Sequence, residues 1–200
     1  MKKCIIVQGP TKSLDEIKKT YLNCNCDIIY SIWEDDENKY DKNDTVVINK
    51  KPNVSGAGNL FYQQKSTLNG FEYAKNHGYE YAIKMRSDMI PINANKFINL
   101  FNEELEFFYW HNYEKGYIVD YFMGGTTQNM IDLWKIDELK KYKYAEEAIT
   151  NSFFEKRMNK KNYHFIGNLI NENNDILWLK HNKYLSSYAK DQSFLNYIKI

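Results

Sequence analysis

The segment from Tyr79 to Pro91, YEYAIKMRSDMIP, constrains the fold more than any other part of the chain. Residues 79 to 85 alternate between a plainly apolar face and a second face that is only partly polar, as in a strand covered on both sides. Pro91 then ends the pattern, because proline cannot donate to a strand ladder. The segment predicts an α/β fold in which a central strand runs into Arg86-Ser87-Asp88.

Asp88 follows this strand directly. In open α/β sheets the ligand sits at the carboxyl ends of the strands. Mg²⁺ or Mn²⁺ commonly takes one or two carboxylates together with phosphate oxygens, so Asp88 could hold such an ion against a bound diphosphate. The alternative is an aspartate that accepts hydrogen bonds from turn N–H groups, and this segment alone favours that alternative.

Composition limits the remaining possibilities. With 200 residues, of which 43% are hydrophobic, the chain can bury the core of one domain. Its 27 basic and 26 acidic side chains give a net charge of only +1, which leaves no strong electrostatic case for nucleic acid binding. We expect no transmembrane segment and no leader, and hence a cytoplasmic protein, with peripheral membrane contact possible. Cys4, Cys24 and Cys26 are expected to be reduced thiols.

Strands and helices are expected to alternate along the chain. Besides the strand that ends near residue 86, we expect strands at 4–7, 27–33, 45–48, 106–110, 117–123 and 176–179. Helices are expected to open at residue 11 and to cover 59–76, 94–104, 126–135 and 144–156. The order strand, helix, strand, strand at the start fits the parallel nucleotide-binding half of an α/β protein.

Several polar or aromatic residues fall at the expected strand ends. Gln8-Gly9-Pro10 closes the first strand, where the absence of a side chain at Gly9 would let a base or ribose approach; an ordinary tight turn fits equally well. Trp33 ends the second strand and could stack on a nucleobase, although a core position is the commoner role for a strand tryptophan.

The helix at 59–76 carries an unusual polar face. Asn59, Gln63, Ser66 or Thr67, and Gly70 share one side of it. Either this stripe faces a ligand, or it is an N-terminal cap continued by exposed residues. Helix propensity alone favours the second explanation.

Three more carboxylates lie in the second half of the chain. Asp120 interrupts an apolar strand that ends at Gly124-Gly125, and a buried carboxylate is costly unless it is paired or used. A structural aspartate bonded to loop N–H groups is the alternative. Glu146 and Glu147 open the helix at 144–156, a position that the helix dipole favours for acidic residues in any case.

Taken in series, six of these segments resemble the WavE-like lipopolysaccharide-synthesis glycosyltransferases and their relatives with the GT-A fold, over residues 4 to 154. The matching segments are Val7-Gln8-Gly9, Ser31-Ile32-Trp33, the helix motif from Asn59 to Gly70, Lys84-Met85-Arg86-Ser87-Asp88, the motif from Asp120 to Gly124, and Ala145-Glu146. The chain departs from the family pattern at Ile32, Tyr62 and Ala145, where the family has Thr, Arg and Pro. Arg86 also replaces the first Asp of the D-x-D metal motif.

The resemblance implies a GT-A-like, Rossmann-like fold: a central, mostly parallel sheet flanked by helices, in one domain over residues 1–200. Residues 1–91 would form the nucleotide-binding half and 92–200 the acceptor half. It implies transfer of a sugar from a nucleotide-diphosphate sugar donor to a hydroxyl of a glycan acceptor, in surface polysaccharide or glycoprotein glycan synthesis. The cofactor would be Mn²⁺ or Mg²⁺.

The resemblance also implies roles for single residues. Asp88 would hold the metal and His181 would complete its ligands. The alternative for His181 is an ordinary surface histidine. Residues expected to bind the nucleotide sugar are Gln8, Gly9, Pro10, Trp33, Asn59, Gln63, Arg86 and Ser87. The general base of an inverting displacement would be Glu146, Asp120 or Glu147, in that order.

Two other functions stay open on the sequence. A non-catalytic nucleotide- or glycan-binding module could share the same fold, because a fold does not fix a function. A sugar nucleotidyltransferase would also bind a metal diphosphate, but it would carry a Gly-rich, basic signature after its first strand. Thr11-Lys12-Ser13 does not supply that signature.

Overall fold

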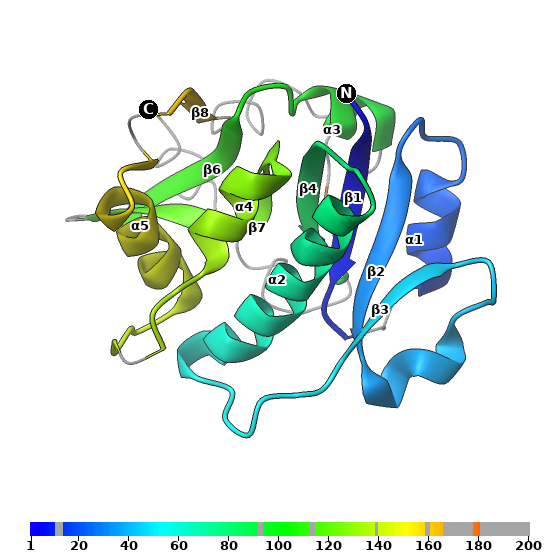
Figure 1. Cartoon of the computed structure of the whole chain (residues 1–200), viewed down its shortest axis with the longest axis horizontal. Coiled ribbons are helices and arrows are strands. Elements are labelled where there is room, and N and C mark those ends of the chain that lie inside the picture. The colour runs from blue at the N-terminus through cyan, green and yellow to red at the C-terminus, as the bar shows by residue number, and fades with distance from the viewer. Residues whose placement is uncertain are drawn as a thin grey trace.

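The computed structural model describes residues 1–10, 14–91, 94–112, 115–138, 140–158, 161–165 and 178–180 (Figure 1). The strands are β1 (Lys3–Gln8), β2 (Asp27–Trp33), β3 (Thr45–Asn49), β4 (Tyr81–Arg86), β5 (Met89–Pro91), β6 (Leu105–Asn112), β7 (Lys115–Thr126), β8 (Tyr163–Phe165) and β9 (Trp178–Lys180). The α-helices are α1 (Leu14–Tyr21), α2 (Leu60–Asn76), α3 (Ala94–Asn99), α4 (Thr127–Trp134) and α5 (Ala145–Glu155). Two 3₁₀ helices, η1 (Glu34–Lys39) and η2 (Ala57–Asn59), complete the described elements.

One seven-stranded sheet organises the chain, in the order β3-β2-β1-β4-β7-β6-β8. Its strands are parallel except β7, which runs antiparallel to both β4 and β6. A second, two-stranded sheet pairs β5 with β9. The expected α/β class with a mostly parallel sheet is confirmed.

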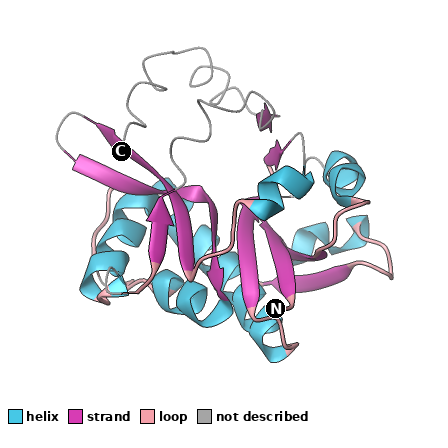
Figure 2. Ribbon diagram, turned by 90° about the horizontal axis from the view of Figure 1, so that it is seen from above, coloured by secondary structure: helices cyan, strands magenta, loops and turns pink. Residues whose placement is uncertain are grey.

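Helices cover both faces of the large sheet (Figures 1 and 2). Helices α2, α4 and α5 pack on one face, and α1 and α3 pack on the other. The strands supply both cores by alternation: in β1, Cys4 and Ile6 belong to one core, whereas Ile5 and Val7 belong to the other. This double cover explains why the central strands read as nearly continuous apolar runs.

Helix α2 begins after a turn of left-handed backbone, with φ of 58° at Gly58 and 60° at Asn59, and it ends beside Gly78 at φ 75°. Gly78 therefore acts as the glycine that ends the helix. Ser66 and Gly70 are buried against the sheet. The interpretation of the polar face as a cap followed by exposed residues is thus wrong for these positions.

Some boundaries differ from expectation. Helix α3 ends at Asn99 instead of residue 104, because the side chain of Asn102 donates to the Asn99 carbonyl and the carboxylate of Glu106 accepts the backbone N–H groups of Asn102 and Glu103. Strands β5 and β8 were not expected. The acidic run after Trp33 forms η1. Across the described residues, no helix has both the length and the apolar character needed to cross a bilayer.

Candidate active site

The carboxyl ends of β1 and β4 meet at one edge of the sheet, where Gln8 pairs with Arg86 in the strand register. The backbone N–H of Ser87 donates to the Gln8 carbonyl at 2.8 Å, and its hydroxyl donates to the Pro10 carbonyl at 2.7 Å. Gly9 has φ 114°, and a Cβ there would lie 3.0 Å from the Ser87 hydroxyl. The structure therefore brings these five predicted site residues together, and glycine is required at position 9.

Arg86 and Asp88 form a two-pronged ion pair just beyond β4. The guanidinium donates through Nε to Oδ1 at 2.9 Å and through its terminal nitrogen to Oδ2 at 2.6 Å. It also lies 4.9 Å from the ring centre of Tyr121. Burial disfavours the charge of Arg86, but the nearby carboxylates of Asp120 and Asp88 outweigh it and raise the arginine pKa. Both side chains keep some solvent exposure, 26% for Arg86 and 18% for Asp88, so a ligand can reach the pair.

This ion pair bears on the expected metal. Both oxygens of Asp88 are engaged by Arg86, and the described residues contain no group of three or more His, Cys, Asp and Glu side chains that could hold a metal ion. A hard cation that takes one carboxylate and the phosphate oxygens of a donor fits here if Arg86 releases one Asp88 oxygen. The second expected ligand, His181, lies outside the described residues; β9 ends one residue earlier, at Lys180, which pairs with Met89.

The residues expected to contact the nucleoside occupy different environments. Gln8 is buried, and its side-chain oxygen accepts from the Ser66 hydroxyl at 2.8 Å. Gln63 donates to the Gly58 carbonyl at 3.3 Å, while its buried side-chain oxygen lacks a hydrogen-bond partner in the described part of the chain. The remaining two are Trp33, which is buried with its ring 5.5 Å from that of Tyr62, and Asn59, which is exposed.

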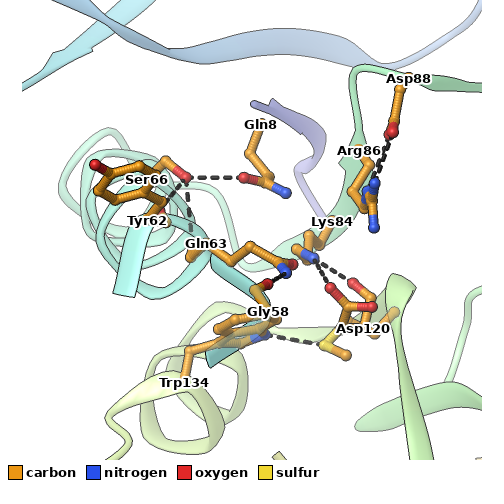
Figure 3. A network of polar contacts seen from close by, with 11 residues as sticks. Gln8, Gly58, Tyr62, Gln63, Ser66, Lys84, Arg86, Asp88, Asp120 and Trp134 are labelled. Carbon is orange, nitrogen blue, oxygen red and sulfur yellow. Dashed lines mark hydrogen bonds and ion pairs between the residues drawn. The ribbon is translucent and has the colours of Figure 1, made fainter. Parts of the chain in front are cut away.

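Asp120 is buried in β7, and its neighbour Lys84 is fully buried in β4 (Figure 3). The Lys84 ammonium donates to the backbone carbonyl of Asp120 and lies 3.9 Å from its Oδ2. Apart from this ion pair, neither carboxylate oxygen of Asp120 receives a hydrogen bond from an N–H or hydroxyl donor of the described residues. Burial lowers the pKa of Lys84 to about 8, an effect that Asp120 partly offsets. The ammonium therefore stays charged at neutral pH.

Glu146 opens α5 beside this pair. Burial first, and then the negative charge and proximity of Asp120, raise the pKa of the Glu146 carboxyl to about 7. Glu147 plays a different part, since its carboxylate accepts the backbone N–H of Lys143 at 2.7 Å and so caps the start of the helix. The pKa of Glu146, about 7, lies in the range in which a general base works best.

Sequence reasoning missed Lys84 as a site residue. The alternation in β4 placed it on the partly polar face of a doubly covered strand, and the rule applied to Asp120, that a buried charge must be paired or used, applies to it equally. The Lys84 ammonium also lies 4.5 Å from the ring centre of Trp134 in α4. No local sequence motif predicts this contact.

Comparison with known proteins supports the fold. No protein-family model matches the chain, and no curated protein matches it significantly. Among solved structures, the chain is similar to a protein from Desulfovibrio desulfuricans G20 named "putative nucleotide-diphospho-sugar transferase". The match has a TM-score of 0.57 and 10% sequence identity and covers 100% of this chain and 99% of the other. The fold is therefore GT-A-like, as the sequence resemblance implies.

Proposed function

We propose that the chain is a glycosyltransferase that moves a sugar from a nucleotide-diphosphate donor to a hydroxyl group of a glycan. One observation carries the proposal: the edge of the GT-A-like sheet presents a partly exposed cation, Arg86, close to a carboxyl that titrates near pH 7, Glu146. A leaving diphosphate needs the first group and an attacking hydroxyl needs the second. The name of the Desulfovibrio protein agrees with this chemistry.

On the donor side, the nucleoside would lie over Gln8 and Gly9, with Pro10, Trp33, Asn59 and Gln63 around it. The diphosphate would lie over Arg86 and Ser87. Arg86 suits this role because a guanidinium fork matches the geometry of phosphate as it matches that of carboxylate. Binding would exchange at least one of its bonds to Asp88 for a bond to phosphate.

Asp88, and His181 outside the described residues, would hold Mn²⁺ or Mg²⁺. When bound, such an ion would stabilise the negative charge of the departing diphosphate. An Asp88 oxygen that Arg86 would give up on binding the donor would be available to the ion.

On the acceptor side, the oxygen of a glycan hydroxyl would attack the anomeric carbon of the donor sugar. The bond from that carbon to the diphosphate oxygen would break, and its electron pair would leave with the nucleotide. The hydroxyl proton would pass to the Glu146 carboxylate, with Asp120 as the second candidate base and Glu147 as the third. One displacement of this kind inverts the anomeric configuration. The segments shared with the WavE-like family support a substrate in surface polysaccharide or glycoprotein glycan synthesis.

Titration calorimetry with UDP, GDP and dTDP, each with and without Mn²⁺, tests donor binding. We expect one nucleotide to bind in a metal-dependent way and to stabilise the fold by about 2.7 kcal/mol at a hundredfold excess over its dissociation constant. If none of the three binds, the donor site is wrong.

Catalysis is tested with the sugar form of the nucleotide that binds. Glu146→Gln is expected to lower turnover by ~10² to 10⁴ while donor affinity stays the same. Asp120→Asn is the matched comparison, because it changes the neighbouring carboxyl in the same way. Tight donor binding without turnover of any donor, by the unmodified protein, would instead indicate a non-catalytic binding module.

A further inference from the structure

Lys84 is a buried cation in the middle of a central strand. Its side chain is fully buried, and its ammonium lies 4.5 Å from the ring centre of Trp134. Removing an ammonium from water costs several kcal/mol, and an apolar side chain could pack against the same ring without that cost. The partner that offsets the cost is Asp120, through its carbonyl and its carboxylate.

Asp120 in turn lies near a second carboxyl, that of Glu146, whose pKa its charge helps to raise. The start of α5 is held against β7 here, because the Thr150 hydroxyl accepts the Ile118 N–H and donates to the Glu146 carbonyl. The pair formed by Asp120 of β7 and Glu146 of α5 is surrounded by other charged or titratable groups. Lys84, Arg86 and Asp88 come from β4 and the turn after it, and Tyr144 and Glu147 come from the start of α5. Figure 3 shows the Lys84 ammonium directed at Asp120, with Arg86 turned instead toward Asp88.

Two adjacent carboxyls cannot both ionise cheaply, so they tend to share one proton near neutral pH. Burial alone would put this proton on Asp120, which is 1% exposed, because burial favours the neutral form, and Glu146 keeps more contact with solvent. The nearby cation acts in the opposite direction, since it favours the charged form of the carboxyl that it contacts.

We propose that Lys84 is a positioning residue whose ammonium keeps Asp120 ionised and thereby directs the shared proton to Glu146. Burial and the Asp120 charge raise the pKa of Glu146 to about 7, in agreement with this order of protonation. Neither Asp120 oxygen receives a hydrogen bond from an N–H or hydroxyl group of the described residues, and a protonated Glu146 can supply one. The inference rests on the proposed function only where it makes Glu146 the base; the location of the proton is a property of the protein without substrate.

The experiment follows the proton directly. Carbon-13 labels in the side-chain carboxyls of Asp and Glu are titrated by NMR in the substrate-free protein, with Asp120→Asn and Glu146→Gln used to assign the two signals. We expect the Glu146 signal to carry the protonation step near pH 7. In Lys84→Met, which keeps an unbranched side chain only one atom shorter and removes its charge, the step near neutral pH is expected to move to the Asp120 signal.

Two controls keep the result decisive. Lys84→Gln is a second neutral replacement that can still donate to the Asp120 carbonyl, and it is expected to behave like Lys84→Met. In Asp120→Asn, the Glu146 step is expected to move to lower pH, because a negative neighbour has been removed. The proposal is overturned if the neutral-pH step belongs to Asp120 in the unmodified protein, or if it stays on Glu146 in both Lys84 variants.

Failure of the proposed function gives a different result. If Glu146→Gln retains full transfer, Glu146 is not the base, whatever the NMR titration shows. If Glu146→Gln abolishes transfer but the proton does not move in the Lys84 variants, the base assignment survives and the role of Lys84 is wrong.

Discussion

Replacing Glu146 by glutamine is expected to stabilise the protein at alkaline pH. The pKa of this carboxyl is about 7 in the folded state, against an ordinary value of 4.5. Because the folded protein then binds the proton more tightly than the unfolded chain, the free energy of unfolding falls as the pH rises from about 4.5 to about 7. A glutamine at this position does not titrate, so the free energy of unfolding of the variant does not decrease for this reason as the pH rises.

The size of the effect follows from the same values. At about 1.36 kcal/mol per pKa unit, the difference between 4.5 and about 7 amounts to about 3 kcal/mol at high pH. Most of this difference develops between pH 5 and pH 8. Since a typical domain is stable by only about 5 to 15 kcal/mol, the gain is large enough to measure.

The assay is urea unfolding of the unmodified protein and of Glu146→Gln at pH 5 and pH 8. The stability advantage of the variant is expected to grow by about 2 to 3 kcal/mol between the two pH values. Repeating the comparison in an Asp120→Asn background should reduce the growth, because the Asp120 charge is the second cause of the raised pKa. An advantage that does not change with pH in the unmodified background would refute the reasoning.

Three further predictions concern neighbouring elements. Glu147→Ala should lower the free energy of unfolding in urea by about 1 kcal/mol, because it removes the acceptor of the Lys143 N–H. Asp88→Asn should fold normally and weaken Mn²⁺-dependent nucleotide binding at least about tenfold in calorimetry, since a neutral amide is a poorer ligand for a hard cation. If binding is unchanged, Asp88 only accepts hydrogen bonds in the turn and is not a metal ligand. Gly70→Ala should destabilise the fold by about 1 to 3 kcal/mol in urea, because the added Cβ would lie 2.5 Å from Cγ2 of Ile6.

Much of the fold could be predicted because its elements follow local patterns. The alternation in β4 and the helical spacing in α2 identified both elements within one or two residues. The end of α3 could not be read in the same way, since the Glu106 carboxylate that accepts N–H groups after the helix comes from the following strand. The pairing of β5 with β9 joins segments almost ninety residues apart and has no local signal.

The site residues, too, include some that local sequence patterns predict and others that depend on how distant strands pair. Gln8, Arg86 and Asp88 were predictable because parallel strands bring their carboxyl ends to one edge of a sheet. The interaction of Lys84 with Asp120 was not predictable, because it depends on β7 running antiparallel beside β4. Only that direction carries an early residue of β7 to the carboxyl end of its neighbour.

The polar face of α2 shows how the sheet and the donor edge depend on each other. The Asn49 side chain donates to the Ser31 hydroxyl at 2.9 Å, that hydroxyl donates to the Ser66 carbonyl at 2.5 Å, and the Ser66 hydroxyl donates to Gln8 at 2.8 Å. This buried chain links β3, β2, α2 and β1, and the absence of a side chain at Gly70 lets the helix approach close enough to form it. At Ser66 and Gly70 the stripe is therefore not a cap continued by exposed residues, because both residues pack against the sheet. It fixes the side chain of Gln8 at the end of β1, so that changes in the stripe would act on donor binding through Gln8.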